Sequence, residues 1–347
     1  MQKTVNFARR LLVFAPAALV FFFYDTLCRW AVGAMNPLAA VSISRGRQSR
    51  DAVSFSNPFE GFSLKKKDTP RPRAQTVRVE PLHPSYNVKE EFFGSRESDI
   101  VIKKENCYVK NVTNIPNSTV SSYMLAPPAF KVEKNSRRPQ ILIMHTHATE
   151  SYLPYYTTRY DEAYSFRNTD TSLNMVAVGK AMADRLNRLG YNTVQDATLH
   201  DYPSYNGSYD NSKATVESYL EKYPSIKIVL DIHRDAVERN GQIISPAVTI
   251  DGVKYAQLMI ISGADNGYMN MPNYPENLKF ASRVQNKLGE MYPGLARPVL
   301  FDYRNYNQQL TTGSILVEIG SHGATLSMAK ATATAFADSL AAALDSM

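Results

Sequence analysis

The stretch ILIMHTHATESY, residues 141–152, runs from four apolar residues directly into a group of histidines, hydroxyl residues and a glutamate. The apolar part has the length of a buried strand, and similar runs follow at 226–232, 248–250, 258–261 and 314–319. Segments with apolar residues at helical spacing lie between them, at 173–189, 213–223, 278–291 and from about 328 onward. Apolar strands that alternate with amphipathic helices are typical of a sheet covered on both faces. The sequence therefore predicts an α/β domain with a central mixed, mostly parallel sheet flanked by helices.

Composition limits the classes of protein and of site. The chain has 347 residues, 44% hydrophobic and 20% charged, so it can form a large core. Two cysteines, Cys28 and Cys107, are too few for a disulfide framework or a four-cysteine zinc site, so any metal must use His and carboxylate ligands. The net charge of +7 is uneven, because residues 1–73 contain 12 Lys/Arg and 4 Asp/Glu while the other 274 residues contain 27 and 28. The near-neutral folded part argues against nucleic acid as a partner.

The N-terminal residues have the pattern of a membrane segment. Lys3, Arg9 and Arg10 precede an apolar run from Leu11 to Tyr24. This predicts a single-pass membrane anchor within residues 1–35, with the N-terminus in the cytoplasm and the rest of the chain on the extracytoplasmic side. A cleaved signal peptide that ends near residues 32–34 is the alternative.

The rest of the chain divides into three parts by composition. Residues 36–75 are rich in Ser, Arg, Lys and Pro, which predicts a linker. Residues 76–138 contain short alternating apolar pieces and are expected to form a small extended or β-rich segment. Residues 139–347 contain the strand and helix patterns and are expected to form the catalytic domain.

Polar side chains gather where three predicted strands end. His145, His147 and Glu150 follow the first strand, the stretch DIHRDA at 231–236 ends the second, and Glu318 lies in the last. Open α/β sheets bind ligands outside the carboxyl ends of their strands, where the loops converge. A single histidine at a strand end is more often structural. Burying several such groups unpaired is costly, so their coincidence favours a metal or substrate site.

These residue types can build a zinc site. A catalytic zinc usually has three protein ligands and leaves a fourth position to water. His147 and Glu150 form an H-x-x-E pair, and with His233 they are the predicted ligands of Zn²⁺. Glu318 then remains as the catalytic acid/base, an arrangement that hydrolyses amides. Arg234 is expected either to bind a substrate carboxylate or to pair with a neighbouring aspartate.

Two features leave the ligand set open. His145 and His147 are two residues apart, so in an extended chain both face the same side, and a site of His145, His147 and His233 is an alternative. Asp170, which precedes a predicted helix, is an alternative to Glu150 as the carboxylate ligand.

Four stretches together resemble the stage II sporulation protein P family of endospore-forming bacteria: HTHATESY at 145–152, NMVAVGKAMADRL at 174–186, DIHRDA at 231–236 and LVEIGS at 316–321. The resemblance covers roughly residues 139–347. It implies the fold of a zinc-dependent N-acetylmuramoyl-L-alanine amidase. It also implies an enzyme that cleaves the bond between muramic acid and L-alanine and, in addition, stem-peptide cross-links. It further implies a role in septal wall remodelling during engulfment, with partners similar to stage II sporulation proteins D and M.

The same resemblance implies roles for individual residues. His145 and His147 match the first histidine motif and His233 the second, and Glu318 matches the catalytic acid/base. Ordinary zinc amidases take their carboxylate ligand near the start of the first helix, where this chain has Asp170. Their Pro-Gly-His-Gly-Gly stretch is replaced here by His-Thr-His-Ala-Thr, which is typical of the sporulation branch.

We therefore expect a membrane-anchored zinc amidase that acts on peptidoglycan. A zinc peptidase acting on stem peptides only is one alternative. A non-catalytic peptidoglycan-binding module that recruits partners is another, from a different functional class.

Overall fold

The structure covers most of the chain. The computed structural model describes residues 85–161 and 163–347. The anchor predicted within 1–35 and the linker predicted at 36–75 lie outside the described residues. Across the described ranges, none of the helices combines the length and the apolar character needed to cross a bilayer.

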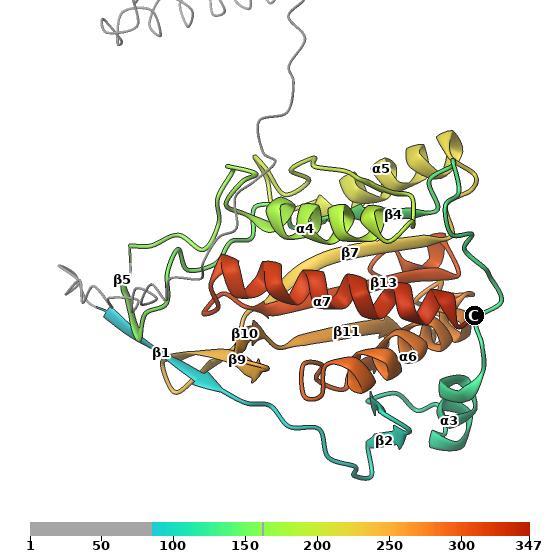
Figure 1. The fold of residues 1–347 in the computed structure, drawn as a ribbon, viewed down its shortest axis with the longest axis horizontal. Helices are drawn as coiled ribbons and strands as arrows, with labels where there is room; N and C mark the ends of the chain where they lie inside the picture. The colour runs from blue at the N-terminus through green and yellow to red at the C-terminus, as the bar shows by residue number, and fades with distance from the viewer. Residues whose placement is uncertain (1–84, 162) are drawn as a thin grey trace, which may run out of the picture. The chain divides into compact units, whose positions relative to one another are not determined.

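Eight strands form the main sheet (Figure 1). In spatial order they are β2 (Val101–Lys104), β3 (Cys107–Asn111), β12 (Val299–Asp302), β11 (Leu258–Gly263), β13 (Gly313–Ser321), β7 (Ile228–Asp235), β4 (Ile141–Met144) and β6 (Thr193–Gln195). The pairs β13–β7, β7–β4, β4–β6, β11–β12 and β12–β3 are parallel, whereas β11–β13 and β2–β3 are antiparallel. The main sheet is mixed, as predicted. Because β11 is antiparallel to β13 and β12 is parallel to β11, both β11 and β12 begin at the edge of the sheet where β7 and β13 end.

The alternation of side chains along β4 decides which helices cover which face of this sheet. The described helices are α3 (Asn117–Leu125), α4 (Met175–Arg188), α5 (Ser208–Lys222), α6 (Tyr274–Met291), α7 (Leu326–Asp345) and the short 3₁₀ helix η1 (Gln308–Leu310). Ile141 and Ile143 join the large core, which α4, α6 and α7 cover. Leu142 and Met144 join a smaller core with Val216 of α5. A strand that is apolar at every position is thus buried on both sides, as predicted.

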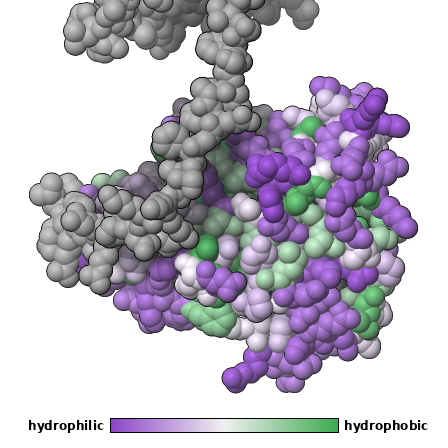
Figure 2. Space-filling model, in the orientation of Figure 1, coloured by the Kyte–Doolittle hydropathy of each residue, from purple (hydrophilic) through white to green (hydrophobic). Residues whose placement is uncertain are grey.

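The Ala-rich helix α7 lies between α4 and α6 on the first face (Figure 1). Thr325 begins it, because its side chain accepts a hydrogen bond from the Met328 amide at 3.2 Å. In the same orientation, Figure 2 shows white to light green residues, of intermediate to weakly hydrophobic character, across the middle of this face and many hydrophilic residues around them. The helix α7 packs against both of its neighbours, and its buried side chains belong to the large core on this face.

A second, smaller sheet has five strands. They are β10 (Val253–Ala256), β9 (Gln242–Ile250), β1 (Ser85–Glu91), β5 (Arg159–Asp161) and β8 (Glu238–Arg239). β1 is parallel to β9, and the other pairs are antiparallel. The segment before residue 139 supplies β1 to this sheet and β2 and β3 to the main sheet, so both sheets are built partly from it.

Candidate active site

The polar residues converge at one edge of the main sheet. β4, β7 and β13 are adjacent and parallel, with Met144 opposite Asp231 and His233 opposite Glu318. Ile232 belongs to the large core, so its neighbours Asp231 and His233 point to the opposite face, where α5 lies. The local strand periodicity therefore selects which side chains can meet.

His147, Glu150 and His233 lie together there, and each is buried. The two imidazole rings are 5.3 Å apart between centroids and perpendicular to each other. His233 Nδ1 lies 3.7 Å from Glu150 Oε2, and its Nε2 lies 2.8 Å from Asp231 Oδ1. Burial alone would lower the pKa of His233, but the charges of Asp231, Glu150 and Glu318 outweigh it and raise this pKa to about 9.

The donor atoms of this cluster fit a divalent metal in their chemistry. Two imidazoles and two carboxylates are the ligands that zinc prefers. Among the residues that the structure describes, His233 Nε2 has no partner in hydrogen-bonding geometry. Within the same residues, however, no three His, Cys, Asp or Glu side chains are spaced as a metal-binding group. The observed distances are those of a charged His233 held between two carboxylates.

Glu318 faces this cluster from β13. In the described part of the chain, its Oε2 atom is buried and has no hydrogen-bond partner. Burial raises the pKa of Glu318 to about 8; the positive charge of His233 opposes the shift and the charge of Glu150 adds to it. A carboxyl group with a pKa near neutrality can both accept and donate a proton under physiological conditions, as acid/base catalysis requires.

Asp231 belongs to the cluster, although the sequence indicated it only as a possible partner of Arg234. It accepts hydrogen bonds from the Thr146 amide at 2.9 Å and from the Thr146 hydroxyl at 2.7 Å. Burial acts to raise the pKa of Asp231, but His233 and these hydrogen bonds lower it overall. Asp231 therefore stays ionised and orients the His233 ring. The signal for this role was its position two residues before His233 in a strand.

His145 lies apart from His147. Its Nδ1 is 3.0 Å from the Ile232 carbonyl oxygen and its Nε2 is 3.1 Å from the Gln195 side-chain nitrogen, so both ring nitrogens are engaged. The ring rests against Gly179 of α4, where an added Cβ would lie 2.5 Å from it. The two histidines face different sides because β4 ends at Met144 and residues 146–149 form a turn. The alternative site of His145, His147 and His233 is therefore not assembled.

The two candidate carboxylates also separate. Glu150 Oε2 accepts a hydrogen bond from the Arg234 amide at 3.1 Å and lies beside His233. Asp170 is exposed, and its Oδ1 accepts hydrogen bonds from the amide and hydroxyl of Ser172 at 2.8 and 2.7 Å. Glu150 is thus the carboxylate that the fold brings to the imidazoles, while Asp170 shapes the turn before α4.

Arg234 is used within the protein. Its Nε and Nη2 atoms donate to the carbonyl oxygens of Ser151 and Phe166, each at 2.9 Å, and Nη1 donates to the Asp235 carbonyl oxygen at 3.4 Å. Its guanidinium pairs with neither Asp231 nor Asp235 through their carboxylates. Three of its five N–H donors thus go to backbone carbonyl oxygens, and the side chain ties the loops after β4 to the end of β7.

Sequence reasoning missed an aromatic wall formed by Tyr205, Tyr209 and Tyr306. Tyr205 stacks on His147 with 4.4 Å between ring centroids, and Tyr209 meets the same ring edge-on at 5.6 Å. Tyr306 stacks on Tyr209 at 5.3 Å. The Tyr-rich stretch YPSYNGSY at 202–209 was the available signal. This wall fixes the orientation of His147 and presents apolar surface beside the cluster.

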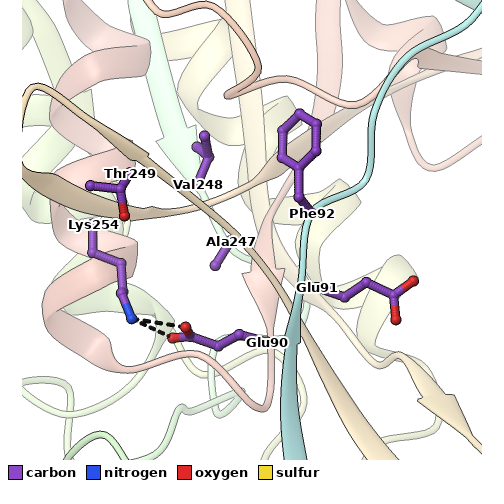
Figure 3. Close-up of a pocket in the computed structure, with 7 residues that line it drawn as sticks. All are labelled: Glu90, Glu91, Phe92, Ala247, Val248, Thr249 and Lys254. Carbon is purple, nitrogen blue, oxygen red and sulfur yellow. Dashed lines mark hydrogen bonds and ion pairs between the residues drawn. The ribbon is translucent and has the colours of Figure 1, made fainter.

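A separate pocket of about 280 Å³ lies on the small sheet, between the end of β1 and the β9–β10 hairpin (Figure 3). Lys254 pairs with Glu90 at 2.8 Å beside it, and the exposed Phe92 lines another side. None of its lining residues belongs to the histidine cluster, so this pocket is not part of the candidate active site.

Residues 58–341 match the family described as stage II sporulation protein P. The stage II sporulation protein P of Bacillus subtilis (strain 168) is 29% identical over 209 residues, which are 57% of this chain and 49% of that protein. The chain thus spans about half the length of this curated relative.

Solved amidase structures are also similar. The CwlD amidase from Clostridioides difficile, solved in complex with the GerS lipoprotein, has a TM-score of 0.36 and 10% identity over 60% of this chain and 97% of that chain. The N-acetylmuramoyl-L-alanine amidase AmiC2 of Nostoc punctiforme has a TM-score of 0.35 and 16% identity over 60% of this chain and 96% of that chain.

Proposed function

The chain belongs to the stage II sporulation protein P family, and from that membership we propose that residues 139–347 carry a peptidoglycan hydrolase that cleaves the N-acetylmuramoyl-L-alanine amide bond. One observation supports this proposal above the others. Glu318 is half-buried and has a pKa of about 8, its Oε2 atom is buried without a hydrogen-bond partner in the described structure, and it faces a cluster of two imidazoles and two carboxylates. That set of groups is suited to moving a proton during amide hydrolysis.

In this proposal His147, Glu150 and His233 hold Zn²⁺. The ion, when bound, would lower the pKa of its water and polarise the amide carbonyl. Glu318 takes the proton of the attacking water on Oε2 and returns it to the departing nitrogen. Asp231 keeps the His233 ring in place, while Thr146 holds Asp231 in turn.

The location and partners of the protein are part of the same proposal. The apolar run from Leu11 to Tyr24 supports attachment to the membrane by residues 1–35, with the hydrolase on the extracytoplasmic side in the septal space. Family membership supports partners similar to stage II sporulation proteins D and M, and a role in engulfment.

The experiment measures release of soluble wall fragments by the purified protein, with and without chelator, and identifies the opened bond by mass analysis. Glu318→Gln should lower turnover by about 10³-fold while zinc stoichiometry is retained, because only the proton carrier is lost. Glu90→Gln is the matched control, since Glu90 pairs with Lys254 on the small sheet (Figure 3). Normal turnover by Glu318→Gln would contradict the proposal.

Zinc stoichiometry of single alanine variants tests the ligands. Variants of His147, Glu150 and His233 should lose the metal, whereas those of His145 and Asp170 should retain it. Opening of stem-peptide bonds alone would identify a peptidase. Binding of peptidoglycan without any fragment release would identify a recruitment module.

A further inference from the structure

Arg297 reaches the same edge of the sheet from a segment that the sequence did not single out. It lies between α6 and β12, and its amide donates to the Leu258 carbonyl oxygen at the start of β11, at 2.8 Å. Its side chain is buried, and Nη1 donates to Asp235 Oδ2 at 2.9 Å. Asp235 is the last residue of β7, two positions after His233. The guanidinium is therefore anchored beside the catalytic cluster.

The other edge of this guanidinium is free. Within the described ranges, Nε and Nη2 of Arg297 are both buried and both lack a hydrogen-bond partner. These two nitrogens share one edge of the planar group, and their N–H bonds run parallel, which matches the two oxygens of a carboxylate. Nη1, which donates to Asp235, lies on the other side of the guanidinium from this edge. What is left unpaired is thus a complete bidentate fork.

A purely structural arginine does not leave such a fork. Arg234, in the same site, uses Nε, Nη1 and Nη2 to donate to three backbone carbonyl oxygens. Leaving buried charged donors unpaired is costly, so such a group calls for a partner, and a bidentate ligand is the partner that fits two parallel donors. The contrast between the two arginines therefore points to a ligand for Arg297.

The fork is also close to the reacting groups. Glu318 Oε2 is buried without a hydrogen-bond partner in the same described region. The Arg297 charge acts to lower the pKa of Glu318, against the dominant effect of burial. The backbone places them in the same neighbourhood, because Leu258, which accepts the hydrogen bond of the Arg297 amide, pairs with Ile319, the residue after Glu318. A group bound on the fork would therefore lie on the side of the sheet edge where β13 carries Glu318.

We infer that the Nε–Nη2 edge of Arg297 binds a free carboxylate on the peptide part of the substrate, beside the scissile amide. This inference rests on the proposed function, and it adds the chemical class of the substrate: an acidic peptide rather than its amidated counterpart. Because the fork is withdrawn from water, a carboxylate that reaches it forms two charge-assisted hydrogen bonds with little competition from solvent.

The test uses two soluble muramoyl peptides that differ only in a carboxylate or a carboxamide on the second residue of the peptide, the one that follows the L-alanine of the scissile bond. The full protein should cleave the carboxylate form with a kcat/KM about 30-fold higher, the lower end of the range for losing one partner of a buried charge pair. Arg297→Gln should reduce this ratio to within about twofold, and Arg297→Lys, which keeps the charge but not the fork, should give an intermediate ratio. Arg185→Gln is the matched control, because Arg185 pairs with Asp338 between α4 and α7.

Two results would overturn the inference. One is an unchanged preference for the carboxylate form in Arg297→Gln. The other is an equal fall of kcat/KM for both substrates, which would assign Arg297 to holding Glu318 or the fold.

Loss of the proposed function is distinguishable from loss of this inference. If the wild-type protein cleaves neither peptide, the amidase proposal fails. Equilibrium binding of the same two peptides then tests the fork alone. Tighter binding of the carboxylate form that disappears in Arg297→Gln supports the fork, and equal binding of both forms overturns it.

Discussion

Replacing Gly179 by alanine should destabilise the protein even though alanine is the better helix former. Gly179 lies inside α4, and an alanine methyl at this position would be 2.5 Å from Cε1 and Nε2 of His145 and 2.8 Å from the Gln195 side-chain nitrogen. Contacts this short require neighbouring atoms to shift. The neighbours cannot shift freely, because the His145 ring is held by the Ile232 carbonyl and by Gln195.

The magnitude follows from three contributions to the free energy of unfolding. Overpacking a buried site costs about 1–3 kcal/mol. Weakening the two buried hydrogen bonds of His145 costs about 1 kcal/mol each. The higher helix propensity of alanine offsets about 1 kcal/mol of this loss. We expect a net loss of about 2–4 kcal/mol, measured by urea unfolding of the purified protein.

A double-mutant cycle with His145→Ala isolates the contact. The single variant His145→Ala should also cost about 2–4 kcal/mol, because it leaves a cavity and two unpaired groups. In the double variant the methyl group added at position 179 occupies part of the space that the His145 ring has left. The double variant should therefore lose less unfolding free energy than the sum of the two single losses, by at least about 1 kcal/mol. Lys180→Ala, at the exposed next position, is the control and should change stability by less than about 0.5 kcal/mol.

Two outcomes would refute this reasoning. If Gly179→Ala were as stable as the wild type, the His145 ring would not be locked against α4. If the two losses were simply additive, the methyl group and the ring would not compete for the same space. Either result would reopen the assignment of His145 as a structural residue.

Two further predictions concern titrating groups. Burial lowers the pKa values of His145 and His322 to about 4. As the pH falls below 6.5 the unfolded state takes up a proton on each histidine before the native state does. Each histidine therefore contributes up to about 3 kcal/mol of stability that is full above pH 6.5 and is lost by the time the pH has fallen through about 4. Unfolding free energies measured in chelator between pH 7 and pH 4 should show this slope, and a slope unchanged in His322→Asn would contradict it. Burial also raises the pKa of the Cys107 thiol to about 12. In a Cys28→Ser background the native thiol should therefore resist alkylation at about pH 8 while the urea-unfolded thiol reacts, and equal rates would disprove the burial argument.

Much of the main sheet could be predicted, because apolar runs of strand length are local signals. Ile141–Met144 forms β4 as expected, and the helix predicted at 173–189 is α4, which ends just before Gly190. The small sheet could not be predicted in this way. Its strands β1, β5 and β9 come from distant segments, and their pairing depends on contacts that no local periodicity reports.

Only the site residues that lie inside strands could be placed from the sequence. His233 and Glu318 lie inside strands, and their neighbouring positions follow from parallel pairing. The common orientation expected for His145 and His147 is wrong, because the chain turns immediately after Met144 and rotates the second side chain away from the first. The free edge of Arg297 depends on which of its donors find partners, and only three-dimensional packing determines that.

The main sheet changes strand direction between β13 and β11, and this has a consequence for how the site is divided along the chain. The reversal of direction brings the connection between α6 and β12 to the edge where β7 and β13 end, so one short segment can change without altering the strands that hold His233 and Glu318. On the inference drawn for Arg297, the residue that contacts the peptide and the residues proposed for the chemistry therefore lie in separate stretches of the sequence.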